Sequence, residues 1–512
     1  MKTLNVAIKI RNWRRAVVAL TLIMFALFCN NGTAQIQQAW AVRYNNGITN
    51  GTNQALKMAL DPAGSIYITG FSQNANTNLG YVTIKYAPNG NQLWAARYDS
   101  TNYPSAAPAG LVLDTRNNAF VTGNALTIKY DSNGNQLWAA PYNATAIATD
   151  GSNNIYIAGV SNSFETIKLN PSGSNLWTAV DSGVYPGPKN LALAIAVDPA
   201  GNAYVAGDEV FYSNSFQGAE VSLAIVAYNA TGGVIWRDNN LTFVDEGAIG
   251  AYVGVTSLTL DAQTNLYVEL GQTVPNDTAY YTFKIASNGS VLWTAYPASG
   301  NGNNTAYGMA ISSSSNLLLA GQVFHMRNTA YGTIELNTNG SAVWTNLYPA
   351  AYSGMGAGMG IAIDSANNCY VTGYSPGTNS ANDIVTIKYD SNGNQIWLQR
   401  YNGPANGNDG GNAIAVDNNG NVYVTGSSAN ASGGTDIVTI KYSPLTLQRR
   451  SDGTVLLQGQ GSPGESFDIQ ASADLRSWLD LGSVTADTNG LMQFDDTNAS
   501  NYNARFYYTS PQ

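Results

Sequence analysis

The stretch "TIKYDSNGNQLWAA" at residues 127–140 occurs twice more in nearly the same form, as "TIKYAPNGNQLWAA" at 83–96 and "TIKYDSNGNQIWLQ" at 386–399. Two other phrases recur in fixed order with it. One is an alternating segment that ends in Asp, such as "LALAIAVD" at 191–198, and the other is a short segment of the type "VYVTG" at 422–426. Self-similarity of this kind is the signature of a repeat architecture, in which each copy supplies one supersecondary unit.

Eight tryptophans mark the last segment of the repeated unit. They are Trp40, Trp94, Trp138, Trp177, Trp236, Trp293, Trp344 and Trp397. Around them, Val, Ile, Tyr, Phe and Thr alternate with a period of two and are bounded by Asn and Gly clusters, which predicts β-strands. We find no helical periodicity between Gln35 and Gln512.

The connections between these strands have the chemistry of tight turns. In "DSNGN" the Asn-Gly pair tolerates a positive φ and closes an antiparallel hairpin, and "DPAGN" (198–202) and "DNNGN" (417–421) repeat this pattern. Each unit therefore contains two hairpins, or four antiparallel strands. Four strands at a period near 50 residues predict an all-β fold, a β-propeller in which each unit is one blade.

The two ends of the repeat region complement each other. Residues 36–44 read as a fourth strand with no three strands before it, and the last unit, 411–442, has three strands but no fourth. We expect the strand of Trp40 to pair with 436–442 and to close the ring, because closure removes two exposed sheet edges. The prediction is eight blades, or seven if the shortest unit, 139–177, is not an independent blade.

The repeated phrases "A-I-A-V-D-x-x-G-N-x-Y-V-T-G" and "T-I-K-Y-D-x-x-G-N-x-x-W" resemble those of the secreted bacterial β-propeller repeat family (SBBP-type repeats). The resemblance covers about 36–442 and is closest at 359–442. The chain departs from the family pattern at 208–253, where the linkers lengthen, and in the eight-fold count, since the family is often described as seven-bladed. The resemblance implies a surface or extracellular propeller, and it implies no catalytic residue.

Residues 1–34 have the pattern of a secretory signal peptide. Basic residues precede an apolar segment at 16–28, and small residues at 32–34 predict cleavage before Gln35. The alternatives are a membrane anchor and a lipoprotein site at Cys29. About 13 apolar residues are too few to span a bilayer, and the residue before Cys29 is the bulky Phe28.

After the predicted propeller, 35–443, the repeated phrase stops. Residues 444–512 hold about six shorter strand patterns, which predict a small β-sandwich. This segment resembles fibronectin-III-like or adhesive modules of secreted bacterial proteins.

The charge balance of the chain narrows its partners. Asp and Glu outnumber Lys and Arg by 32 to 23, and the predicted cleavage removes five basic residues and no acidic ones. This acidic balance argues against nucleic acids and anionic membranes as partners. Cys369 would be the one cysteine left, so no internal disulfide is expected, and its place in a strand predicts a core position.

The sequence shows no catalytic, cofactor or metal motif. His325 is the one histidine and no G-x-S-x-G elbow accompanies it, so we expect it to be structural or incidental. A single histidine also excludes multi-histidine zinc sites. The "DSNGN" turns contain possible calcium ligands but lack the spacing of a calcium loop. We therefore expect no cofactor and no bound metal.

Candidate ligand contacts lie in the longest linkers. The residues are Asp208, Glu209, Tyr212, Phe216, Asp245, Glu246 and Tyr252. If the loops after the second and fourth strands of each blade emerge on one face, the two acidic pairs approach each other. Such a carboxylate pair could serve a glycosidase, although we favour solvated loop acids.

Aromatic residues in the same linkers favour neutral polar ligands such as sugars, because tyrosine rings stack and amides donate and accept hydrogen bonds. The set extends to Tyr103, Tyr185, Tyr280 and Tyr352. The alternative is that these rings pack over the ends of the blades.

The sequence therefore predicts a secreted or cell-surface, non-enzymatic binding or scaffold protein, monomeric and without a membrane span after cleavage. Its expected partner is an extracellular glycan or a surface protein, contacted by variable loops on a rigid scaffold. The alternatives are a propeller hydrolase or lyase that acts on polysaccharide, and a purely structural component of the cell envelope.

Overall fold

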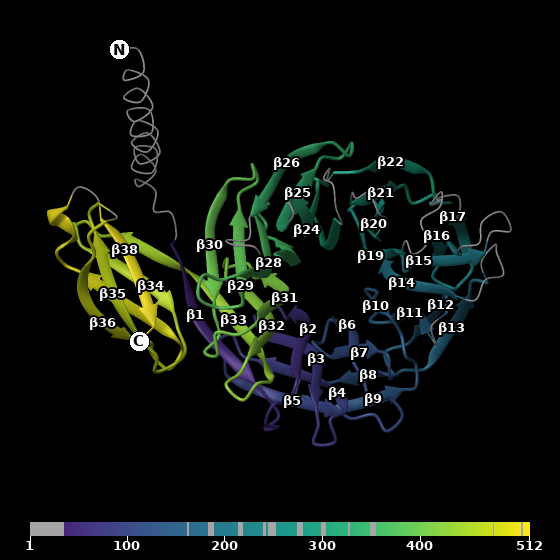
Figure 1. Ribbon diagram of the computed structural model, residues 1–512, viewed down its shortest axis with the longest axis horizontal. Coiled ribbons are helices and arrows are strands. Elements are labelled where there is room, and N and C mark those ends of the chain that lie inside the picture. Colours follow the sequence, from purple (N-terminus) through teal and green to yellow (C-terminus); the bar gives the residue numbers. More distant parts are fainter. Residues whose placement is uncertain are drawn as a thin grey trace, which may run out of the picture. The chain divides into compact units, whose positions relative to one another are not determined.

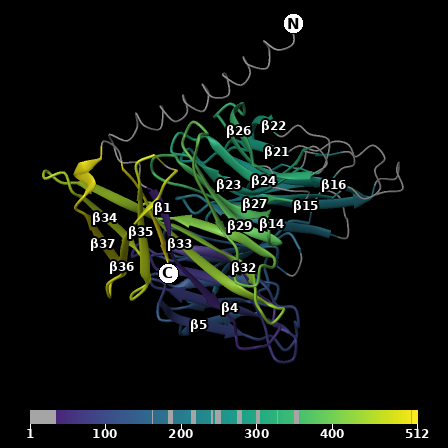
Figure 2. The same ribbon diagram turned by 60° about the vertical axis from the view of Figure 1, so that its left-hand side comes forward.

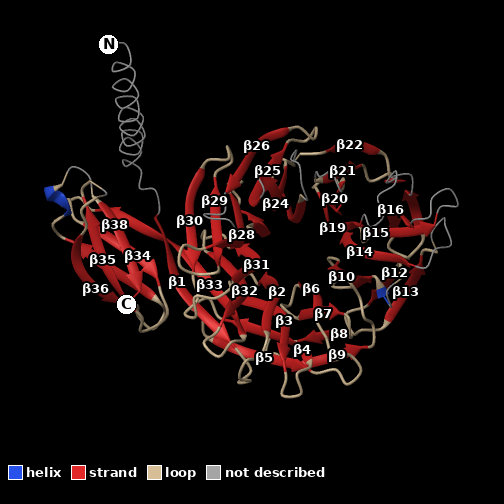
Figure 3. Cartoon of the chain, viewed as in Figure 1, coloured by secondary structure: helices blue, strands red, loops and turns tan. Residues whose placement is uncertain are grey.

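The computed structural model describes residues 35–160, 163–182, 189–212, 219–238, 242–243, 252–273, 280–297, 304–325, 328–348, 355–474, 476–502 and 505–511. The predicted signal peptide, 1–34, lies outside these ranges. Strands make up most of the described chain (Figure 3). The chain divides into two compact units, one formed by 42–440 and the other by 1–41 together with 441–512.

The first unit consists of successive antiparallel sheets, and each sheet is built from consecutive strands of the chain. The first four sheets comprise β2 (Asn53–Leu60), β3 (Ile66–Gln73), β4 (Leu79–Tyr86) and β5 (Gln92–Tyr98); β6 (Pro108–Leu113), β7 (Ala119–Gly123), β8 (Thr127–Tyr130) and β9 (Gln136–Ala140); β10 (Ala146–Thr149), β11 (Ile155–Ala158), β12 (Glu165–Leu169) and β13 (Asn175–Val180); and β14 (Lys189–Val197), β15 (Ala203–Tyr212), β16 (Ala219–Tyr228) and β17 (Val234–Asp238), with β18 (Thr242–Phe243) beside β16. The shortest predicted unit thus has a four-stranded sheet of its own, β10–β13.

The following sheets repeat the same order. They comprise β19 (Tyr252–Leu260), β20 (Leu266–Thr273), β21 (Tyr281–Ile285) and β22 (Val291–Ala295); β23 (Thr305–Ile311), β24 (Leu317–His325), β25 (Asn328–Leu336) and β26 (Ala342–Tyr348); β27 (Ala357–Ile363), β28 (Cys369–Pro376), β29 (Asn382–Tyr389) and β30 (Gln395–Tyr401); and β31 (Asp409–Val416), β32 (Val422–Ala429) and β33 (Thr435–Arg449). The predicted all-β fold of four-stranded antiparallel units is confirmed.

The sheets of this unit are arranged around a common centre, with the first strand of each sheet nearest to it (Figure 1). The first strands of consecutive sheets contact one another, and β2 also contacts β31 and β32. The N-terminal strand β1 (Gln35–Tyr44) pairs with β33. This is the pairing that the sequence predicted for the strand of Trp40.

The turns between third and fourth strands follow one pattern, seen at Asp131–Asn135. The Asp131 Oδ1 atom accepts hydrogen bonds from the backbone N–H groups of Asn133 and Asn135, and Gly134 has a φ of +87°. Only the glycine, not Asn133, takes a left-handed conformation here. The turn is therefore a helical turn followed by a left-handed glycine, and the register of β8 and β9 shifts beside it.

Each of these turns also forms the contact between neighbouring sheets. The Trp94 Nε1 atom and the Lys85 Nζ atom both donate to the Ser132 carbonyl oxygen of the next sheet, at 3.1 and 3.2 Å. The Trp94 indole lies so close to Gly134 that a Cβ atom there would be 2.6 Å from the ring. We call this arrangement of indole, lysine, turn carbonyl and turn glycine the inter-sheet clamp.

The indole–glycine contact recurs around the unit. The further pairs are Trp138–Gly173, Trp177–Gly232, Trp236–Gly289, Trp293–Gly340 and Trp344–Gly393. The clamp lysine also lies near an Asp of its own sheet and over an aromatic ring: Lys85 Nζ is 3.6 Å from Asp61 Oδ2 and 4.6 Å from the Tyr67 ring centroid. The tryptophans thus fill the space between sheets.

Sheet β23–β26 departs from this pattern in two coupled places. Glu335 stands where most of the other sheets have the clamp lysine, and Ser312 replaces the Asp that the lysine would meet. The Asn316 Nδ2 atom donates to Glu335 Oε1 at 2.7 Å instead. Because Ser312 removes the second carboxylate, the buried Glu335 does not face a like charge.

The second unit contains strands from two sheets. Part of β33 pairs with β34 (Val455–Gln460), which pairs with β37 (Leu491–Asp496), and a three-stranded sheet has the order β36 (Leu479–Thr485), β35 (Ser466–Ser472), β38 (Phe506–Pro511). Figure 2 shows these strands from a second side. Leu457 and Met492 from the first sheet share one buried core with Phe467, Ile469 and Tyr507 from the second. The predicted strands of 444–512 are present.

One buried carboxylate interrupts a repeated polar pair. Four sheets place two threonine hydroxyls in contact at the same position, namely Thr69–Thr83, Thr122–Thr127, Thr372–Thr386 and Thr425–Thr439. In sheet β19–β22 this pair is Glu269 and Thr282, and the Thr282 hydroxyl donates to Glu269 Oε2. Glu269 is fully buried and its Oε1 atom has no partner among the described residues. Burial raises the pKa of Glu269 well above its usual value, so the folded chain holds it protonated.

The clamp predicts that Gly134 is irreplaceable. Gly134→Ala should lower the free energy of unfolding by about 2 kcal/mol, because it places a Cβ at a left-handed φ and against the Trp94 ring. Gly151 is a matched control, since a Cβ there meets nothing within 4 Å and its φ is not positive. Urea unfolding curves of both variants test this. Equal loss in Gly134→Ala and Gly151→Ala would show that the turn glycine has no special role.

The buried Glu269 predicts a specific pH dependence. Because its pKa is raised in the folded chain, it favours folding most at low pH, and stability falls as pH rises above the pKa of the unfolded chain, by up to about 1.4 kcal/mol per pH unit. Glu269→Gln should therefore match the parent at pH 4 and be more stable at pH 8. Unfolding midpoints across this range measure the effect, with Glu165→Gln, a partly exposed glutamate, as control. Parallel pH curves for parent and Glu269→Gln would contradict the prediction.

Candidate functional site

The acidic candidates Asp208 and Glu209 are not loop residues. Both lie within β15 and both are buried, with 6% and 1% of their surface exposed. The expectation of solvated loop acids is therefore wrong for this pair. The linker after the second strand is shorter than the sequence indicated, because β15 and β16 continue pairing as far as Tyr212 and Ala219.

Glu209 has a structural partner. Its Oε2 atom lies 3.0 Å from the Arg237 Nη2 atom, and the Arg237 Nε atom lies 2.9 Å from Asp181 Oδ2. One guanidinium thus joins two acidic side chains that are far apart in the sequence. The Asp208 Oδ1 atom accepts a hydrogen bond from the backbone N–H of Val255 in the next sheet. These contacts hold β14–β17 to its surroundings and leave neither carboxylate facing solvent.

The other members of the predicted site are placed only in part. Tyr212 is the last residue of β15 and Tyr252 is the first of β19, but their side chains lie outside what the structure describes. Phe216, Asp245 and Glu246 lie outside the described residues. The proximity of the two acidic pairs therefore stays a prediction.

Four single residues that the sequence singled out can be placed. Tyr280 directly precedes β21 and is fully buried in a core cluster, so for this ring the packing alternative holds, whereas Tyr103 is 42% exposed. His325 is the last residue of β24 and does not follow it. Cys369 is buried in the core, as predicted.

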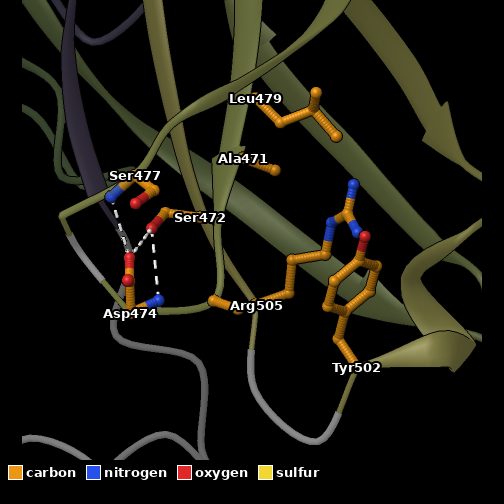
Figure 4. Close-up of a pocket in the computed structure, with 8 residues that line it drawn as sticks. Ala471, Ser472, Asp474, Ser477, Leu479, Tyr502 and Arg505 are labelled. Atoms are coloured by element: carbon orange, nitrogen blue, oxygen red, sulfur yellow. Dashed lines mark hydrogen bonds between the residues drawn. The ribbon is translucent and has the colours of Figure 1, made fainter.

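A pocket of about 220 Å³ opens in the second unit, at one end of sheet β36–β35–β38 (Figure 4). Its polar lining consists of Ser472, Asp474, Ser477, Tyr502 and Arg505, and Leu479 and Ala471 contribute apolar surface. Ser472 ends β35, Leu479 begins β36, and Arg505 directly precedes β38. Three strand ends therefore supply the lining.

Arg505 is held in position by two neighbours. Its guanidinium carbon lies 4.1 Å from the centroid of the Tyr502 ring, and its Nε atom is 2.6 Å from Asp496 Oδ2. The hydroxyl of Tyr507 also donates to Asp496 Oδ2, at 3.0 Å. The Arg505 side chain is only 6% exposed. Its planar fork is thus fixed by stacking and by charge before any ligand binds.

Asp474 lies across the pocket from Arg505 (Figure 4). Its Oδ1 atom accepts hydrogen bonds from the backbone N–H groups of Ser477 and Arg476 and from the Ser472 hydroxyl. The hydrogen bonds from Ser477 and then Arg476 lower the pKa of Asp474, so it is ionised at neutral pH. The pocket therefore offers a fixed cation, a fixed carboxylate and hydroxyl groups around an apolar floor.

The sequence analysis did not find this site. Its residues are neither clustered in the chain nor part of a motif, and Arg505 is separated from Asp474 by two further strands. The one signal present was the group of aromatic and charged residues near the C-terminus. The pairing of β35 with β38, not a local pattern, brings them together.

The described part of the chain contains neither a cluster of metal ligands nor a membrane-spanning helix. No three His, Cys, Asp or Glu side chains of the described ranges gather where they could hold a metal ion. None of the helices within those ranges is long and apolar enough to cross a membrane.

Comparison with protein families returns two propeller matches. Residues 396–433 match the family described as "Beta-propeller repeat", and residues 79–327 match the family described as "Outer membrane protein assembly factor BamB". Both matches fall within the repeated sheets, and the first includes the Trp397 strand and the following unit.

The chain is also similar to individual proteins. An uncharacterised WD repeat-containing protein, L264, of Acanthamoeba polyphaga mimivirus is 24% identical over 447 residues, and the match covers 67% of this chain and 31% of the viral protein. The chain thus spans about a third of that relative's length.

Two solved structures of proteins of unknown function show weaker likeness. One from Dyadobacter fermentans is 11% identical with a TM-score of 0.40, covering 80% of this chain and 99% of its own. One from Bacteroides caccae is 14% identical with a TM-score of 0.32, covering 55% and 93%. Both TM-scores are too low to bear on the fold or the function. The two family matches, together with the recurring four-stranded sheets, support a β-propeller repeat protein.

Proposed function

We propose that this chain is an exported, non-enzymatic binding scaffold, in which a closed eight-bladed β-propeller carries a small β-sandwich module. Its ligand is an extracellular glycan or a surface protein. The observation that carries the binding role is the preorganised pocket around Arg505, where a charged fork is held in place without a ligand. Preorganised polar groups over an apolar floor are the general form of a small-ligand site.

The closed ring is supported by contacts of the first strands. Two hydrogen bonds also join the last sheet to the first. The N–H of Thr435 donates to the Gly51 carbonyl, and the Asn412 Nδ2 atom donates to the Ala55 carbonyl. These hydrogen bonds join residues that are more than 350 positions apart. A ring closed by β1 leaves no open sheet edge at the ends of the array.

Export is supported by the segment 1–34 and by the match to a family named for an outer membrane assembly factor. An extracellular or envelope-associated place fits both. The enzymatic alternative has no comparable support, because Asp208 and Glu209 are buried and Glu209 is ion-paired. A purely structural role would leave the Arg505 pocket without a purpose.

Arg43 provides a test of ring closure. Its Nε atom is 2.9 Å from Asp436 Oδ2, and its terminal nitrogens donate to Ser428 and Ala429. Arg43→Ala should lower the free energy of unfolding by about 3 kcal/mol, because it leaves the largely buried Asp436 without its cation. Arg116→Ala, at an exposed position, should change it by less than about 0.5 kcal/mol. Equal stability of the two variants in denaturant would mean that β1 does not lock the ring.

Binding can be measured on a broad glycan array probed with the purified chain, with and without EDTA. We expect reproducible glycan hits that persist in EDTA, because no described group of side chains could hold a metal ion. Hits lost in EDTA would contradict the metal-free site. An array without hits would contradict a glycan ligand and leave a surface protein or a structural role.

A further inference from the structure

We propose that the pocket between Asp474 and Arg505 binds one neutral sugar ring of a glycan, with Arg505 donating hydrogen bonds to its hydroxyls and Asp474 accepting from them. This inference rests on the proposed binding function and names its site and its ligand class. It moves the binding site from the long linkers of the repeat region to the C-terminal module.

The donors are available. The contacts of Arg505 are its ion pair with Asp496 through Nε and its stacking on Tyr502. The two terminal nitrogens of Arg505 form no hydrogen bond to another described residue, although only 6% of the side chain is exposed. Figure 4 shows the guanidinium beside the Tyr502 ring, on the side of the pocket lining away from Asp474. The four terminal N–H groups of Arg505 are thus available to acceptors of a ligand.

The acceptor is available as well. Asp474 uses its Oδ1 atom for the hydrogen bonds from Ser472, Arg476 and Ser477. Its Oδ2 atom accepts none from the described part of the chain. A carboxylate oxygen opposite a guanidinium fork matches a ligand whose groups both donate and accept, and vicinal hydroxyls of a sugar do both.

The charges favour a neutral ligand over an anion. The positive charge of Arg505 is already balanced by Asp496 at 2.6 Å, and Asp474 adds a second carboxylate at the pocket. A uronate or a phosphate would face that second carboxylate and would be repelled. A hydroxyl-rich neutral ring meets no such penalty.

The size and the apolar surface agree with one ring. A volume of about 220 Å³ is below the range of roughly 300–1,000 Å³ that is typical for drug-sized ligands. Leu479, which is 56% exposed, and Ala471 supply apolar surface for the C–H faces of a sugar. Because Arg505 covers the Tyr502 face, Tyr502 serves to position the guanidinium.

The test uses the purified full chain and a panel of neutral oligosaccharides with gluco, manno, galacto and xylo configurations, matched by uronate-containing and sialylated ones. Isothermal titration should give binding to at least one neutral oligosaccharide and weaker binding to its acidic counterpart. Ser477→Trp fills the pocket from an exposed position and should weaken binding by at least about tenfold. Arg505→Lys keeps the charge but loses the fork, and should also weaken it about tenfold.

The control variant is Tyr508→Ala, which removes a tyrosine that is 47% exposed in the same sheet but does not line the pocket. It should bind as the parent does. Thermal unfolding of each variant verifies that the module is folded, and Ser477→Trp is expected to unfold as the parent does even if Arg505→Lys does not.

The outcomes separate the two proposals. Neutral glycan binding that survives Ser477→Trp would overturn the pocket assignment while leaving a glycan-binding protein. Tighter binding of acidic than of neutral sugars would overturn the ligand class. No binding of any saccharide by the parent chain would overturn the glycan function itself.

Discussion

The contact between an indole and a turn glycine is the interaction on which the repeated sheets depend. In the pair Trp94–Gly134, the glycine is needed twice: its φ of +87° closes the hairpin, and its missing Cβ makes room for the ring of the preceding sheet. The same turn presents a carbonyl oxygen to the Trp94 and Lys85 donors. Turn formation and sheet docking therefore use the same residues, so a sheet with the correct turn is also ready to pack.

The contacts between sheets also involve the few charged residues of the chain. Only 11% of the chain is charged, and several of these charges lie between sheets, as Lys129 does beside Asp114 at 3.4 Å with side chains only 6% and 2% exposed. These two charges neutralise each other and form hydrogen bonds, which is the condition under which charges can be buried. Amides and hydroxyls consequently take the place of charges in keeping the surface polar.

The candidate sites show where local reasoning succeeds and fails. Asp208 and Glu209 stood out because two acids follow a "YVAG" phrase, yet the strand continues through them and a distant arginine, Arg237, pairs with Glu209. Arg505 did not stand out, because nothing in its local sequence indicates that its terminal nitrogens donate to no other residue of the described chain. Whether a charged residue is satisfied depends on residues far away in the sequence, so a pattern search overvalues clusters and misses isolated groups.

The sequence by itself determined the strands, their order within each unit, the turns and the pairing of the first strand with the last unit. The strands and turns are encoded by the local alternation of side chains and by turn glycines, and the pairing of the first strand follows from the strand missing in the last unit, so these features can be read without the fold. Only the tertiary structure decided that Glu209 meets Arg237, that Glu269 has no cation, and that Arg505 and Asp474 face one pocket. Those relations depend on the register and stacking of whole sheets, which place side chains from separate strands within a few ångströms of one another.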